Sequence, residues 1–287
     1  MRSDCHIHMV LDGHYWKSAM ARHDPKADDI FIRRILQTYR DLGYTYLRDG
    51  GDRYGAGKRA RELSAEYGLI YRTPLSPLSK KGHYGAFIGE TFESLKEYAD
   101  LVEKMDRNGC DFIKIMISGL MDFDRFGVLT EEGLPAFEIR EMIHIAHDHG
   151  FAVMAHANGA RTIEAAAAAG VDSVEHGAYQ DADSLAAMAA CGTVWVPTLS
   201  TIGNLQGKGR FNERAVRAIL DSALSNCEAF AAMGGILASG SDAGAWAVPH
   251  GCESEEDWLR QALGDRTAEI MAAGTEQIRC RFCRESN

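Results

Sequence analysis

Short runs of hydrophobic and β-branched residues alternate along this chain with longer segments in which apolar side chains recur at helical spacing. After an opening run at residues 4–9, further strands are predicted at 44–49, 69–75, 111–118, 152–157, 173–176, 193–199 and 236–241. Helices are predicted at 30–42, 60–67, 93–108, 134–149, 161–169, 184–190, 213–233 and 267–282. Eight strands that alternate with helices are typical of repeated βα units around a parallel sheet.

Glycine follows most of the predicted helices, where a residue with positive φ ends a helix favourably. These glycines are Gly43, Gly68, Gly109, Gly150, Gly170 and Gly234. An open, doubly wound sheet would also accommodate eight such units, but no G-x-G-x-x-G follows the first strand. The sequence therefore favours an α/β fold of the (β/α)8 TIM barrel type, and its 287 residues predict one domain over 1–287.

Composition and charge narrow the classes of partner. The net charge of −10 and the lack of a basic stripe argue against nucleic acid, and no apolar run approaches the ~20 residues needed to cross a membrane. Only residues 1–3 precede the first strand, which is too short for a signal peptide, and seven scattered cysteines suit reduced thiols. We expect a cytoplasmic protein that acts on a small molecule, with a homo-oligomer left open.

The first predicted strand carries His6 and His8, whose spacing points both imidazoles to the same face. Two neutral imidazoles suit a divalent metal better than an apolar core, although such a pair also arises by chance. A second unusual residue, Lys114, lies in the otherwise apolar strand 111–118. An unpaired buried ammonium would cost several kcal/mol, so Lys114 must have a partner or be modified.

Further metal-binding side chains end the later strands: His156, His176 and Asp242. In (β/α)8 barrels the chemistry lies at the carboxyl ends of the strands, where loops from all units meet. Together with the first-strand pair and Lys114, these residues predict a metal centre at that end of the barrel.

This arrangement resembles the amidohydrolase superfamily, whose barrels carry His-x-His on strand one, a carboxylated lysine on strand four, histidines on strands five and six, and aspartate on strand eight. The likeness extends to LRDGG at 47–51, KGH at 81–83, AGVDSVEHG at 169–177 and VPTL at 196–199. These segments look like the imidazolonepropionase-like branch that includes prolidase-type Xaa-Pro and Xaa-Arg dipeptidases. The resemblance runs from residue 4 to the last predicted helix.

The resemblance implies a binuclear metal centre. His6, His8 and Asp242 would hold one divalent ion, and His156 and His176 would hold the other. Nitrogen and oxygen ligands with open positions suit zinc, with manganese, cobalt or iron as alternatives.

The resemblance also implies roles in catalysis. Carboxylated Lys114 and a hydroxide would be shared between the two ions, which would remove the cost of a buried ammonium. Asp242 would take the proton of the attacking water and deliver it to the leaving amine, and His83 would steady the oxyanion.

The implied function is therefore metal-dependent hydrolysis of an amide bond in a small peptide or an N-acyl amino acid, because Lys114 favours two metals over the one-metal deaminases. Hydrolysis of a lactone, carbamate or ester, ring deamination, and a metal-binding barrel without activity stay open as alternatives.

Most relatives add a β-sandwich from both flanks, which we expect to be absent here, either because the barrel is bare or because an N-terminal part is missing. After strand four the chain reads SGLMDFD at 118–124 where dipeptidase relatives often read GGVMSP, so substrate preference is expected to differ.

Residues that follow strand ends are candidates for substrate contact because the loops of a barrel line its mouth. The principal candidates are Arg53, Tyr84, Arg125, Tyr179 and His250, with Arg53 and Arg125 as clamps for a carboxylate. The wider set adds His14, Tyr15, Trp16, Tyr54, Asn158 and Trp246. Strand alternation predicts that Glu175, next to His176, points away toward the helices and is structural.

Overall fold

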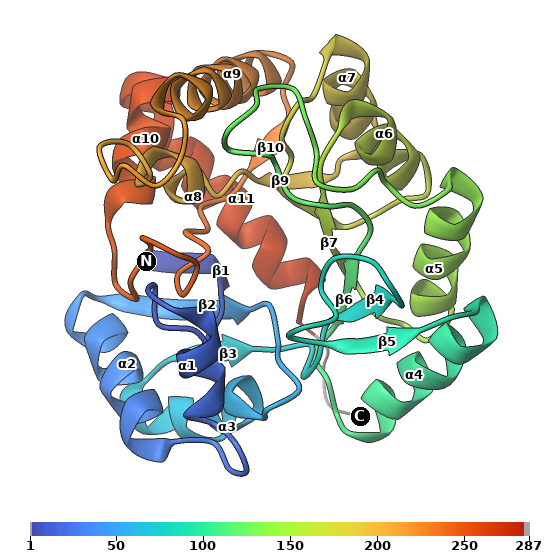
Figure 1. Cartoon of the computed structure of the whole chain (residues 1–287), viewed down its shortest axis with the longest axis vertical. Helices are drawn as coiled ribbons and strands as arrows, with labels where there is room; N and C mark the ends of the chain where they lie inside the picture. The colour runs from blue at the N-terminus through green and yellow to red at the C-terminus, as the bar shows by residue number, and fades with distance from the viewer. Residues whose placement is uncertain (1, 284–287) are drawn as a thin grey trace.

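Parallel strands form a central ring in this computed structural model, which describes residues 2–283, and helices surround the ring on the outside (Figure 1). The strands are β1 (Arg2–Ile7), β2 (Tyr44–Asp49), β3 (Ile70–Arg72), β4 (Leu78–Lys80), β5 (Glu90–Phe92), β6 (Ile113–Met116), β7 (Val153–Ala157), β8 (Ser173–His176), β9 (Val194–Val196) and β10 (Ile236–Leu237). They pair in parallel as two sheets, ordered β1-β2-β3 and β10-β9-β8-β7-β6-β4-β5. The predicted α/β fold with parallel strands is confirmed.

Isolated backbone hydrogen bonds connect the two sheets at both junctions. The amide of Cys5 donates to the carbonyl of Ser239 over 2.9 Å, which joins β1 to the segment after β10. At the other junction the amide of Asp111 donates to the carbonyl of Thr73 over 3.0 Å. The strands are therefore arranged as a ring whose hydrogen-bonded ladder is interrupted twice, and a fully closed barrel stays a prediction.

The helices are α1 (Trp16–Ala21), α2 (Asp29–Asp41), α3 (Ala56–Ser64), α4 (Leu95–Arg107), α5 (Ala136–Asp148), α6 (Ala160–Ala168), α7 (Ala182–Cys191), α8 (Ser200–Gly203), α9 (Glu213–Ala232), α10 (Ser254–Leu263) and α11 (Thr267–Arg281). All eight predicted helices are present, and all six predicted glycines have positive φ. Within residues 2–283, none of the helices has both the length and the apolar character that crossing a membrane requires.

Five helices and strands were not predicted: α1, α8, α10, β4 and β5. α1 and α8 have six and four residues, and β4 and β5 have three each, which is too short to show a period in the sequence. α10 is longer, and it fully buries only Glu255 and Leu259, while Trp258, Ala262 and Leu263 pack against the core partly buried, so its apolar face is short.

Apolar residues pack between the ring and the helices, and the interior of the ring holds both an apolar cluster and buried charged residues. β6 and β7 are buried along their whole length, as expected for parallel strands that are covered by helices. Arg48, Lys114 and Glu175 are nevertheless all within 1% of complete burial. The interior of the ring thus holds one group of buried charges, while Glu255 on α10 is buried outside it.

The last helix, α11, lies behind the ring of strands in Figure 1. Its Ile278 and the following Phe282 join Cys5 and Phe112 in one apolar cluster. Gly274 allows the close approach of α11 to β10, since a Cβ at this position would lie 1.8 Å from the carbonyl oxygen of Leu237. The helix therefore depends on a residue without a side chain for its packing.

We expect Gly274→Ala to lower the free energy of unfolding by about 2 kcal/mol, measured by urea denaturation. The higher helix propensity of alanine would by itself raise the stability by about 1 kcal/mol. A loss of stability would therefore show that the contact of the added methyl group with β10 outweighs the gain in helix propensity. The control is Ala273→Gly at an exposed neighbouring position, which loses about 1 kcal/mol through propensity alone. A Gly274→Ala variant as stable as the parent would contradict this packing.

Candidate metal centre

His6, His8 and Asp242 form a compact cluster of metal-binding side chains. The Nε2 atoms of the two histidines are 3.4 Å apart. Asp242 Oδ1 lies 3.6 Å from Nε2 of His6 and 3.4 Å from Nε2 of His8. The ligand atoms all lie within 4.8 Å of one another, so this cluster is able to hold a divalent metal ion.

The backbone at Asp242 turns this carboxylate toward β1. Its φ of 56° is in the left-handed region, where aspartate is tolerated better than most residues. Its amide donates to the carbonyl of His6 over 2.7 Å, which ties the turn directly to the strand that carries the histidine pair.

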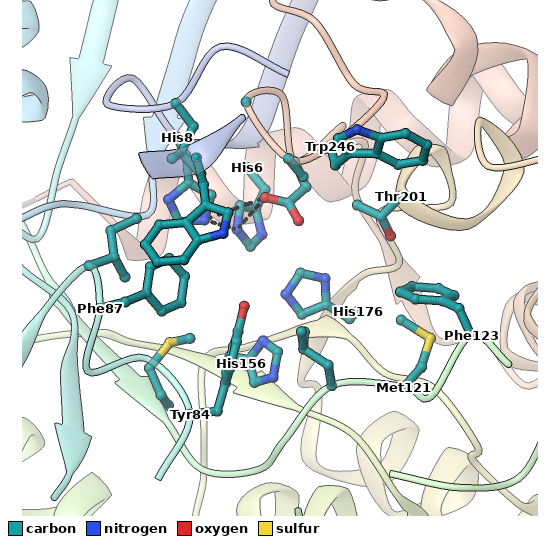
Figure 2. Close-up of a pocket in the computed structure, with 18 of the residues that line it drawn as sticks. His6, His8, Tyr84, Phe87, Met121, Phe123, His156, His176, Thr201 and Trp246 are labelled. Atoms are coloured by element: carbon teal, nitrogen blue, oxygen red, sulfur yellow. Dashed lines mark hydrogen bonds and ion pairs between the residues drawn. The ribbon is translucent and has the colours of Figure 1, made fainter. Parts of the chain in front are cut away.

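Two further histidines complete the arrangement. His156 belongs to β7 and His176 to β8, and their ring centroids are 4.6 Å apart. The ring of His176 lies 5.1 Å from that of His6, so the imidazoles of three strands converge (Figure 2). The structure thus brings together the predicted ligands, and their binding of metal stays a prediction.

Lys114 lines the same cavity from β6. Its side chain is buried, and its Nζ has no hydrogen-bond partner among residues 2–283. The same holds for Nδ1 of His8 and Oδ1 of Asp242. Buried polar atoms are normally paired, so this group of orphaned atoms fits a site built for metal ions and an anionic group.

Burial sets the charge of the site. Desolvation, reinforced by Lys114, lowers the pKa of His8 and of His156 to about 3, and holds the pKa of His6 and His176 well below its usual range. Neutral imidazole is the form that binds metal. Desolvation likewise lowers the pKa of Lys114 to about 8 and raises that of Asp242.

Glu175 holds His6 in place, contrary to its predicted position against the helices. Its Oε2 lies 2.8 Å from Nδ1 of His6, and its Oε1 accepts from Arg48. A neutral His6 donates from Nδ1 to this carboxylate, which leaves the lone pair of Nε2 for a metal. The predicted direction of Glu175 was wrong because His176 has a φ of 67°. This backbone angle ends the alternation of side chains along β8, so the side chains of Glu175 and His176 both face the interior.

The histidines form one wall of a cavity of about 440 Å³. Its other walls are mainly apolar and include Leu11, Tyr15, Trp16, Tyr84, Phe87, Ile88, Met116, Leu120, Met121, Phe123 and Trp246. His14, Thr201 and Arg210 add polar groups. A cavity of this kind suits a small, largely apolar molecule oriented by a few polar contacts.

Of the five principal substrate candidates, only Tyr84 lines the cavity, with its ring 4.9 Å from that of His156. Arg53 is exposed and donates to the hydroxyl of Tyr54, and Arg125 is paired with Asp122. The structure brings neither predicted carboxylate clamp to the cavity.

The remaining candidates also lie outside the cavity lining. Tyr179 packs edge-on against Phe126, with ring centroids 5.6 Å apart. His250 is held by the hydroxyl of Tyr39 at 3.3 Å and the carbonyl of Leu11 at 3.0 Å. The side chain of His83 is 38% exposed, with Nδ1 3.5 Å from Glu131.

From the wider candidate set, His14, Tyr15, Trp16 and Trp246 line the cavity. Asn158 is structural, since its side chain bridges the carbonyl of Gly119 and the amide of Ala178. Phe87 and Arg210 were missed by the sequence analysis. Both lie well beyond the strand ends, and only the folding of the loops over the ring brings them to the cavity.

Two curated proteins are similar to this chain in sequence. The chain is 25% identical to ochratoxinase of Aspergillus niger in an alignment of 279 residues that covers 83% of this chain and 56% of the relative, so it spans just over half of that protein. It is 29% identical to an uncharacterized protein of Mycobacterium tuberculosis, covering 94% of this chain and 70% of the relative. No model of a known protein family matches the chain.

Solved structures share the fold. A Xaa-Pro dipeptidase crystallised with methionine in its active site has a TM-score of 0.78 at 20% identity, covering 97% of this chain and 75% of that one. The crystal structure of A. niger ochratoxinase also has a TM-score of 0.78, at 21% identity, covering 97% of this chain and 70% of that one. The predicted resemblance is confirmed: the chain shares its fold with a Xaa-Pro dipeptidase and with ochratoxinase, and it is similar in sequence to ochratoxinase.

We expect Thr198→Val to weaken metal binding at His176 about tenfold, because Thr198 Oγ1 lies 2.7 Å from Nδ1 of this histidine and orients the ring. Zinc binding to the chelator-treated protein, followed by calorimetry, measures the change. Thr198→Ser keeps the hydroxyl and serves as the matched control. Equal affinities for the two variants would rule out this orienting contact.

Proposed function

We propose that this chain is a metal-dependent hydrolase of the amide bond in an N-acyl amino acid or small peptide, built on one closed (β/α)8 barrel. The observation that carries the proposal is that four histidines, Asp242 and Lys114 line one wall of an apolar cavity, and that the Nζ of Lys114 has no hydrogen-bond partner among residues 2–283. The similarity of the chain to ochratoxinase in sequence, and to a Xaa-Pro dipeptidase in fold, supports hydrolysis of an amide bond.

The ligands divide into two sets. His6, His8 and Asp242 would hold one divalent ion, and His156 and His176 would hold a second. Zinc suits these nitrogen and oxygen donors best. When bound, such ions lower the pKa of a water molecule and polarise the carbonyl of the amide.

Lys114, as a carbamate, would supply an anionic ligand between the two ligand sets. Its lowered pKa leaves a fraction of the amine neutral, and that amine adds to carbon dioxide to form a carbamate while it releases one proton. The product is an anion, which converts a costly buried cation into a ligand for cations.

Asp242 is the group that we propose to move the proton. Desolvation raises its pKa, so its carboxylate is a stronger base than an exposed aspartate. It would accept the proton of the attacking water and pass it to the nitrogen of the leaving amine as the carbon–nitrogen bond breaks.

Lys114→Met tests the function, because it keeps the length of the side chain but cannot form a carbamate. We expect metal content to fall from about two ions per chain to about one or fewer, and amide hydrolysis to fall at least about 100-fold. Metal analysis and assays with N-acyl amino acids and dipeptides measure both.

Lys80→Met is the matched control. Lys80 lies on the neighbouring strand β4 and pairs with Glu138, 2.7 Å away, and it does not line the cavity. This variant should keep its metal and activity. A parent protein that binds less than about one divalent ion per chain, or a fully active Lys114→Met variant, would sink the proposal.

A further inference from the structure

The cavity has two sides with the histidines between them (Figure 2). The first, here called the aromatic side, is formed by Trp16, Tyr84 and Phe87. Trp16 and Tyr84 both pack on Phe87, with ring centroids 5.3 and 5.8 Å away respectively. In Figure 2, Tyr84 and Phe87 lie on the opposite side of the histidines from Trp246 and Phe123.

The second side, here called the arginine side, is formed by Phe123, Thr201, Arg210 and Trp246. The guanidinium carbon of Arg210 lies 4.4 Å from the centroid of the Trp246 ring. Phe211 braces this group, with ring centroids 5.2 Å from Phe123 and 6.2 Å from Trp246. The stacking holds the guanidinium at the cavity although the side chain is exposed.

Arg210 has no hydrogen bond or ion pair to any acidic group within residues 2–283. Some exposed arginines are paired, such as Arg217 with Asp221 at 2.9 Å, and others, such as Arg214, also have no ion pair among residues 2–283, so the feature that distinguishes Arg210 is its place at the cavity. Within the described part of the chain, Lys114 is the only other lysine or arginine that lines the cavity, and Asp242 is its only carboxylate. A guanidinium that is held by an aromatic ring and has no protein partner is well suited to a carboxylate of a ligand.

The aromatic side, in contrast, contains no cationic side chain among its three residues. The three residues that form this side carry rings and no carboxylate, so they suit an apolar or aromatic group better than the α-ammonium of a dipeptide. The cavity volume of about 440 Å³ accommodates a small two-part molecule that reaches both sides.

We propose that Arg210 determines substrate specificity by binding the free carboxylate of an N-acyl amino acid. The apolar or aromatic acyl group occupies the aromatic side, the amino-acid half occupies the arginine side, and the amide lies at the histidines between them. This assignment rests on the proposed amide hydrolysis, and it selects N-acyl amino acids over dipeptides.

Two measurements on the metal-loaded protein test this assignment. The first compares kcat/KM for N-benzoylglycine, for its carboxamide and for glycylglycine. The second measures binding of 3-benzoylpropionate, in which a methylene replaces the amide nitrogen so that the ligand is not hydrolysed, and of its carboxamide.

We expect the parent to prefer each carboxylate over its carboxamide by about tenfold to 100-fold, as a charge-assisted hydrogen bond predicts. Arg210→Met should abolish the preference, and Arg210→Lys should retain part of it because lysine keeps the charge but not the planar fork. Lys208→Met is the matched control, since Lys208 is an exposed neighbour outside the cavity lining and its loss changes the net charge equally.

The outcomes separate this proposal from the function on which it rests. Binding that prefers the carboxylate through Arg210, without turnover of any amide, supports the subsite and overturns the proposed hydrolysis. Turnover without a preference for the carboxylate, or a preference that survives Arg210→Met, overturns the role of Arg210. Faster hydrolysis of glycylglycine than of N-benzoylglycine overturns the choice of acyl group.

Discussion

The buried ion pair between Arg48 and Glu175 is the interaction on which both the ring of strands and the site depend. Arg48, on β2, donates to the carbonyl of Cys5 on β1 over 2.7 Å, to the hydroxyl of Ser173 on β8 over 2.9 Å and to Glu175 over 2.8 Å. Its guanidinium carbon also lies 4.4 Å from the ring centroid of Phe282, which follows α11. One side chain therefore connects the two sheets and the segment behind them. Removal of one partner from such a pair costs about 3–5 kcal/mol, because the other charge is left buried.

The same pair extends into the site through His6. Glu175 shares its two oxygens between Arg48 and the Nδ1 of His6, so the charge that stabilises the ring also selects the tautomer of the histidine. A change in the packing of the ring around Arg48 would therefore change the direction in which His6 points its Nε2. Burial acts in a similar way on the other groups, because it favours neutral imidazole at His8 and His156 and neutral amine at Lys114.

Left-handed backbone at strand ends aims several of these side chains. His176, Thr198 and Asp242 have φ values of 67°, 48° and 56°. Such conformations cost of order 1 kcal/mol or more in residues other than glycine, and they persist where surrounding contacts hold them. Here they turn one candidate ligand, the hydroxyl that orients it and the carboxylate toward the same space. The local strain thus coincides with the candidate metal centre.

The sequence by itself determined the order of the eight predicted strands and eight predicted helices, and it identified six candidate metal-site residues on or next to those strands. Both depend on local information: the period of apolar positions reports which face is buried, and the two-residue spacing of His6 and His8 sets a common direction. Only the tertiary structure decided that Glu175 points to His6 and that His83 is partly exposed. It also decided that Arg210 lines the cavity, whereas Arg53 and Arg125 do not. These features depend on backbone angles at single residues and on loops that pack across the ring, where contacts between distant segments outweigh the local pattern.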